Sequence, residues 1–158
     1  MGYDLADLER PRTKKSVTLS GVVAGNTAIS SVSPIGDALR YRGYDILDLA
    51  DECEFEEIAH LLIHGTLPTP AQLTAYMAKL RALRGLPLAV RQALEALPAA
   101  AHPMDVLRTG ISALGCTFPE ASDHNLSDAR QIADRLIGCA GSMLMYGHQY
   151  AANGREIE

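Results

Sequence analysis

The residues best suited to chemistry in this sequence are a glutamate and two histidines at helical spacing. Glu57 and His60 form an E-x-x-H motif, and His64 follows one helical turn later. Bundles that hold two iron ions use such motifs, but they need two copies and further glutamates on facing helices. This sequence has one copy, which shares with Glu56 the face opposite an apolar stripe. Two interpretations stay open, a small metal-binding helical protein or a solvated polar face, and the low ligand count favours the polar face.

A further histidine, His102, stands beside a proline and an acid in the run HPMD. It could act as a general base, but no serine or cysteine nucleophile lies next to it. Proline suits the first position of a helix, which would make Pro103 a helix start. Asp105 then places negative charge near the positive end of the helix dipole. We therefore expect His102 to cap a helix rather than to catalyse a reaction.

Basic residues form the third group that could bind a ligand, because each could meet a phosphate or a carboxylate. They are Arg40, Arg42, Lys79, Arg81 and Arg84. Exposure to solvent is the usual situation of such side chains. The glycines of SGVVAGNT match neither a dinucleotide-binding loop nor a P-loop, so no phosphate-binding loop is predicted. The sequence also contains no evident catalytic triad, zinc motif or carboxylate pair.

Helical patterns dominate the chain from residue 45 onward. Thr69, Pro70 and Gln72 together have the pattern of a capped helix start. The small residues of the segments 106–113 and 136–147 indicate close approach of neighbouring helices. The expected helices cover 45–51, 54–64, a segment from Thr69 to Gly85, 88–97, a segment opened by Pro103, and 127–152.

The first part of the chain has a different composition. Residues 1–15 read as a flexible leader, and residues 16–44 as a short β ribbon with strands at SVTLSG, NTAISSVS and ALRYRG. Residues 34–37 have the composition of a hairpin turn. The sequence therefore predicts three regions: a leader (1–15), a β ribbon (16–44) and a helical part (45–158).

Composition limits the classes of function. The chain has 158 residues, of which 47% are hydrophobic and 5% aromatic, and a formal charge of −5. These values favour a helical protein and argue against a general nucleic-acid binder. The opening residues do not resemble a signal peptide, and the uncharged stretch 136–153 is too polar for a membrane span, so we expect no membrane association. Three widely spaced cysteines predict buried, reduced thiols and a cytoplasmic location.

Several segments together resemble the citrate synthase superfamily, most of all its 2-methylcitrate synthase branch. They are GVVAGNTAISSV, YRGYDILDLADECEFEEIAHLLIHGTLPT, LRALRGLP and HPMDVLRTG, in this order and spacing. The resemblance implies a mainly α fold, in which citrate synthase-like large-domain helices are preceded by a small antiparallel β ribbon. It also implies that the domain is incomplete, because members of the family are well over twice as long.

The resemblance implies a reaction as well. The family condenses an acyl-CoA with oxaloacetate: an aspartate removes a proton beside the thioester, one histidine stabilises the enol and another polarises the ketone. The intermediate formed by this condensation is then hydrolysed. Propionyl-CoA or acetyl-CoA would be the acyl substrate, with no other cofactor bound. The intact enzyme would be a homodimer joined through large-domain helices.

The resemblance places the catalytic histidines and the aspartate in the later part of the family. We therefore expect no catalytic residue among these 158, and Lys79 as the one residue in contact with substrate. A fragment of this kind would expose apolar helix faces, such as Val106–Gly110–Ala113 and the glycines between residues 136 and 147. The alternative is a binding or structural module that pairs with a separate second half or with a synthase subunit.

Overall fold

The structure is a computed structural model that describes residues 27–32, 38–118 and 125–154. The predicted leader, the strand at residues 16–21 and the turn at 34–37 lie outside the described residues. The described part is mainly helical with a small antiparallel sheet, as predicted. Its elements are β1 (Ser30–Val32), β2 (Leu39–Tyr41), β3 (Tyr44–Asp45), α1 (Ile46–Glu52), α2 (Phe55–His64), α3 (Pro70–Ala82), α4 (Leu88–Glu95), α5 (Pro103–Thr117) and α6 (Leu126–Asn153).

Side-chain caps fix where several helices begin. The Thr69 side chain accepts a hydrogen bond from the backbone N–H of Gln72 at the start of α3, and the Gln72 side chain accepts from the backbone N–H of Thr69. Asn125 starts α6 by accepting from the backbone N–H of Asp128 at 3.0 Å. These bonds satisfy amide groups that have no partner within the helix. The capping box predicted for α3 is therefore confirmed.

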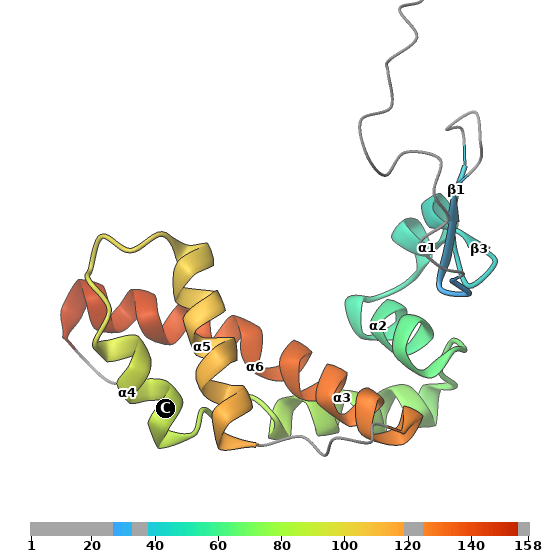
Figure 1. Cartoon of the computed structure of the whole chain (residues 1–158). Helices are drawn as coiled ribbons and strands as arrows, with labels where there is room; N and C mark the ends of the chain where they lie inside the picture. Colours follow the sequence, from blue (N-terminus) through green and yellow to red (C-terminus); the bar gives the residue numbers. More distant parts are fainter. Residues whose placement is uncertain (1–26, 33–37, 119–124, 155–158) are drawn as a thin grey trace, which may run out of the picture.

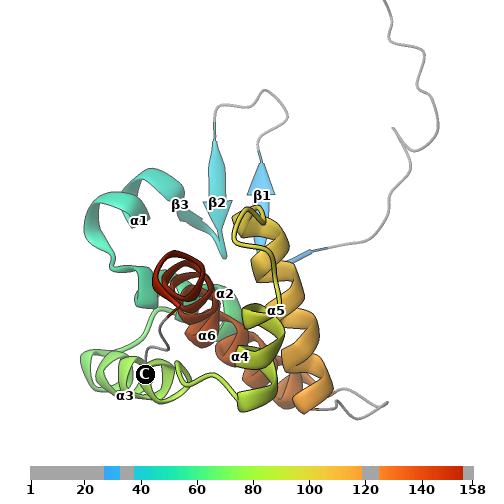
Figure 2. The same cartoon turned by 90° about the vertical axis from the view of Figure 1, so that its left-hand side faces the viewer.

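Helices α2 to α5 pack on α6, whereas α1 packs beside β2 and β3 (Figure 1). Its 28 residues span roughly 42 Å at about 1.5 Å per residue. Helices α2 and α3 lie along its N-terminal half, and α4 and α5 lie along its C-terminal half (Figure 1). Figure 2 looks nearly along α6, with α3 on one side and α4 and α5 on the other.

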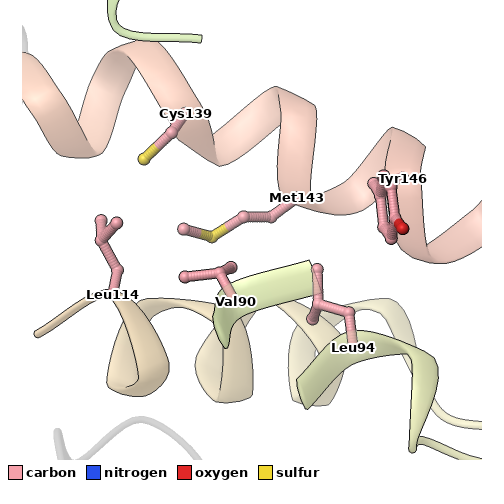
Figure 3. Close-up of a cluster of buried hydrophobic side chains, with 6 residues drawn as sticks. All are labelled: Val90, Leu94, Leu114, Cys139, Met143 and Tyr146. Atoms are coloured by element: carbon pink, nitrogen blue, oxygen red, sulfur yellow. The ribbon is translucent and has the colours of Figure 1, made fainter. Parts of the chain in front are cut away.

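The larger hydrophobic core joins α4, α5 and α6. Its six buried side chains face one another between the three helices (Figure 3). Met143 of α6 is fully buried and lies beside Val90 of α4. The core consists of Val90, Leu94, Leu114, Cys139, Met143 and Tyr146.

Gly110 of α5 and Gly147 of α6 allow these two helices to approach closely. A Cβ atom on Gly110 would lie 2.8 Å from the Met143 sulfur, and one on Gly147 would lie 2.8 Å from Val106 Cγ1. The predicted close approach is therefore confirmed. The expectation that the Val106–Gly110–Ala113 face is left exposed is wrong, because this face packs against α6 within the chain. Met104 and Ile111 are the exposed apolar residues of α5 instead.

The sheet has the order β1-β2-β3 and is antiparallel throughout. Arg42 (φ 52°) and Gly43 (φ 95°) form a tight turn between β2 and β3. Tyr44 and Asp45 then pair back onto β2, so the ribbon, predicted to end at residue 44, ends one residue later. Arg42 connects this turn to the helices, because its Nη2 donates to the carbonyl of Leu62 at 2.8 Å.

Candidate functional site

A buried carboxylate lies where α2, α3 and α6 meet. Asp134 of α6 is completely buried. Its Oδ1 accepts from the Tyr76 hydroxyl at 2.8 Å, and its Oδ2 lies 2.5 Å from Lys79 Nζ. The His64 ring nitrogen Nε2 lies 3.4 Å from Oδ1 and 3.3 Å from Oδ2. We call Asp134, His64, Tyr76 and Lys79 the Asp134 cluster.

The donors around Asp134 stabilise its ionised form. Burial by itself raises the pKa of Asp134, but hydrogen bonds from Lys79 and Tyr76 and the charge of Lys79 outweigh it. The pKa is therefore lower than usual. Burial, followed by the hydrogen bond to Asp134, raises the pKa of Tyr76. Both pKa shifts are those expected for an ionised carboxylate that accepts hydrogen bonds from a neutral phenol and a cation.

His64 enters the cluster as a neutral ring. Burial lowers its pKa, and the attraction of Asp134 does not outweigh that effect. Since an ionised carboxylate can only accept, the tautomer with a proton on Nε2 is the one that fits Asp134. The ring stacks on His60 with 4.6 Å between centroids and meets the edge of Tyr76 at 5.4 Å. His60 in turn places Nδ1 2.8 Å from the carbonyl of Thr66.

Glu57 and His60 of the E-x-x-H motif have different structural roles and do not form a shared site. Glu57 closes a capping box at the start of α2, because its Oε2 accepts from the backbone N–H of Glu54 at 2.8 Å. His60 and His64 face α3 and α6 through Tyr76 and Asp134 rather than forming a purely solvated face. Within the described ranges, no group of three or more His, Cys, Asp or Glu residues is placed to hold a metal ion.

His102 is the N-cap of α5, as predicted. Its Nδ1 accepts from the backbone N–H of Met104 at 3.2 Å, which gives an otherwise unpaired amide a partner. The side chain is exposed. This geometry is that of a helix start.

The prediction of buried thiols holds for one of the three cysteines. Cys139 is buried in the larger core, and burial raises the pKa of its thiol. Cys116 is exposed and Cys53 is intermediate, so the prediction is wrong for these two. Cys116 lies in the last turn of α5, on the part of its surface that no described helix covers.

The basic residues take different positions. The Lys79 side chain is 44% exposed while its ammonium group pairs with Asp134. Arg84 instead lines a groove of about 710 Å³, together with Arg91 and, from α6, Gly138, Gly141 and Ser142. Lys79 and Arg84 therefore belong to two different places on the molecule, the Asp134 cluster and the groove. The predicted contact between Lys79 and substrate stays a prediction.

Sequence reasoning did not single out Asp134, which is the centre of the cluster. A signal was present one turn further along α6, at Gly138. A Cβ atom there would lie 2.8 Å from Leu83 Cβ and 3.1 Å from the Leu80 carbonyl. A glycine that permits such an approach indicates a covered helix face. An acid four residues earlier on that face is then expected to be buried and paired.

Comparisons with known proteins show a match along most of the chain. Residues 18–158 match the family described as citrate synthase, C-terminal domain. The chain is 49% identical over 140 residues to 2-methylcitrate synthase of Shewanella oneidensis, covering 89% of the chain and 36% of that protein. It is 47% identical over 115 residues to 2-methylcitrate synthase of Mycobacterium tuberculosis, covering 73% of the chain and 29% of that protein. The chain thus spans roughly a third of the length of these curated relatives.

Solved structures show the same fold. Citrate synthase from Thermotoga maritima matches with a TM-score of 0.74 and 30% identity, over 89% of this chain and 36% of that chain. Citrate synthase from Thermoplasma acidophilum, solved with carboxymethyl coenzyme A and oxaloacetate, matches with a TM-score of 0.70 and 23% identity over 89% of this chain and 42% of that chain. The predicted resemblance is confirmed. From the family match and the sequence identities, this chain belongs to the citrate synthase family.

Proposed function

We propose that this chain forms part of the helical scaffold of a cytoplasmic acyltransferase that condenses propionyl-CoA or acetyl-CoA with oxaloacetate, and that it is inactive alone. The proposal rests on one observation: the chain is highly identical to a 2-methylcitrate synthase but covers only part of its length. The chain is 49% identical to a 2-methylcitrate synthase but covers 36% of it. The coenzyme A thioester would be a substrate, and no other cofactor is needed for this chemistry.

The positions of His64 and His102 support the proposal that the chain is inactive alone. Condensation of a thioester with a ketone needs a general base and donors aimed at a developing oxyanion. His102 is bound to the backbone of α5, and His64 is held against a carboxylate that already has two further partners. Neither arrangement leaves the ring directed at a substrate, which fits catalytic histidines supplied by another part of the enzyme.

Exposed apolar side chains support assembly with further protein. They include Leu47, Phe55, Leu88, Met104, Leu126 and Met145. In the assembled enzyme, the rest of the large domain and a second subunit would cover such residues. A homodimer joined through large-domain helices is the proposed state.

Within the part of the chain that the structure describes, no helix has the length and apolar character needed to cross a membrane.

The test is release of the coenzyme A thiol by the purified chain, with oxaloacetate and either propionyl-CoA or acetyl-CoA. The intact Shewanella oneidensis relative serves as the positive control. The expected result is no oxaloacetate-dependent release, although circular dichroism shows a folded helical chain. Co-expression with the remaining two thirds of that relative should then restore turnover. Oxaloacetate-dependent release by the chain alone would overturn the proposal.

Intact helix caps favour a second candidate, a module that pairs with a separately made synthase chain. Side chains cap α1, α3, α5 and α6 within this sequence. A helix with satisfied termini does not depend on a neighbouring segment for them. Recovery of a longer synthase chain with this one at native expression would support the module. Purification of the chain without such a partner would argue against it.

A further inference from the structure

The two pairs of helices on α6 are attached by different kinds of contact. Helices α4 and α5 meet α6 through the six-residue larger core. Helices α2 and α3 meet it through a smaller core of Ala59, Tyr76 and Leu80, with Ile137 partly buried against them. Because it has fewer buried side chains, the smaller core contributes less free energy than the larger one. The Asp134 cluster lies at the same junction and links α2, α3 and α6.

A second polar contact fastens the C-terminal end of α2 to α6. Arg130 Nε donates to the carbonyl of Ile63 at 3.2 Å, and its Nη2 lies 3.4 Å from the carbonyl of His64. Arg130 precedes Asp134 by one turn, so both residues lie along the same face of α6. The N-terminal half of α6 therefore holds the α2–α3 pair by directional hydrogen bonds in addition to the smaller core.

We propose that the Asp134 cluster is a latch that fastens the α2–α3 hairpin to α6, and that its opening frees the hairpin as one unit while α4, α5 and the C-terminal half of α6 keep their core. The reason is the state of the carboxylate. A buried charge that loses its donors is strongly unfavourable unless water reaches it. The hairpin is therefore either docked, with all donors in place, or released, with Asp134 hydrated.

Amide hydrogen exchange of the whole chain tests the latch, because it measures the opening of each helix separately. The first variant is Asp134→Asn, which keeps the shape of the side chain but removes the charge that pairs with Lys79. Exchange in residues 55–64 and 70–82 should become about tenfold faster or more, as for a lost bond to a charged group. Exchange in residues 88–95 and 103–117 should stay within about twofold of the wild type.

Two control variants separate the latch from a general loss of stability. Arg81→Gln removes a charge from the exposed side of α3, outside the Asp134 cluster, and should change neither set of amides. Leu94→Ala weakens the larger core and should accelerate exchange in α4 and α5. The contrast between Asp134→Asn and Leu94→Ala shows which helices each contact holds.

Milder variants keep the test decisive if Asp134→Asn does not fold. Tyr76→Phe removes one donor to Asp134, and Lys79→Met removes the cation while keeping a long apolar stem. Both should accelerate exchange in α2 and α3 selectively. Equal acceleration in all helices would show one cooperative unit and overturn the latch. Unchanged exchange in α2 and α3 would show that apolar contacts hold the hairpin, and would overturn it too.

Discussion

Two glycines three residues apart on α6 allow the packing of α3 to be tested directly. A Cβ atom on Gly138 would lie 2.8 Å from Leu83 Cβ and 3.1 Å from the Leu80 carbonyl, whereas one on Gly141 would meet no atom within 4 Å. Neither residue has a positive φ. Alanine at either position therefore gains the same helix propensity, and the two variants differ only in the contact with α3.

The magnitudes follow from these contacts. Alanine in place of an interior helical glycine stabilises by about 0.5–1 kcal/mol, which is the whole effect expected for Gly141→Ala. At Gly138 the new methyl group is well inside the usual contact distance of about 3.5–4.0 Å between carbon atoms. Because one contacted atom is backbone and another is a Cβ, α3 must move, and such overpacking costs about 1–3 kcal/mol. The two variants should therefore differ by about 2 kcal/mol.

Urea unfolding followed by circular dichroism measures both variants against the wild type. The midpoint should rise for Gly141→Ala and fall for Gly138→Ala, with unchanged dependence on urea concentration. Gly110→Ala is an informative third variant, because the nearest atom to its Cβ is the flexible end of Met143. It should cost less than Gly138→Ala. Equal midpoints for Gly138→Ala and Gly141→Ala would refute the packing of α3 against α6 described above.

Three further predictions concern a cap, a titration and two thiols. His102→Ala should lower the free energy of unfolding by about 1 kcal/mol through loss of the α5 cap, with His102→Asn near the wild type; equal stability of the alanine variant would contradict the cap. Because burial lowers the pKa of His64, the unfolded chain binds a proton first as the pH falls below about 6.5, so stability should decrease there. His64→Gln should weaken this decrease, and identical pH profiles would contradict it. A thiol reagent should label Cys116 in the folded chain and Cys139 only on unfolding, whereas equal rates would contradict the burial of Cys139.

Local sequence signals predicted the elements well because their causes are local. Thr69, Pro70 and Gln72 act within four residues of one another, and so do His102 and Pro103. The predicted bounds of α2 and α6 differ from those observed by at most one residue at each end. The short β3 strand was missed, because it depends on the positive φ of Arg42, a residue type that rarely adopts it.

The candidate site could not be predicted in the same way. Asp134 meets Tyr76 and His64 across 58 and 70 residues of sequence. Helical periodicity places each of these residues on a face of its own helix, but not opposite the others. Helical periodicity also did not predict which face of α5 packs on α6. Val106 and Gly110 contact α6, while Met104 and Ile111 are exposed. Such choices depend on how whole helices cross.

The chemistry of the Asp134 cluster fits docking better than proton transfer. A general base works best when its pKa is near the operating pH and when it reaches a substrate. Asp134 is completely buried, and its pKa is displaced further from neutrality rather than toward it. Tyr76 is displaced in the opposite sense, so its proton is held firmly in the bond to Asp134. These directions are those of groups that stabilise one another, because each shift favours the protonation states in which Tyr76 donates and Asp134 accepts. Lys79 is the member that could change its role, since its side chain is partly exposed and would be released with the α2–α3 hairpin.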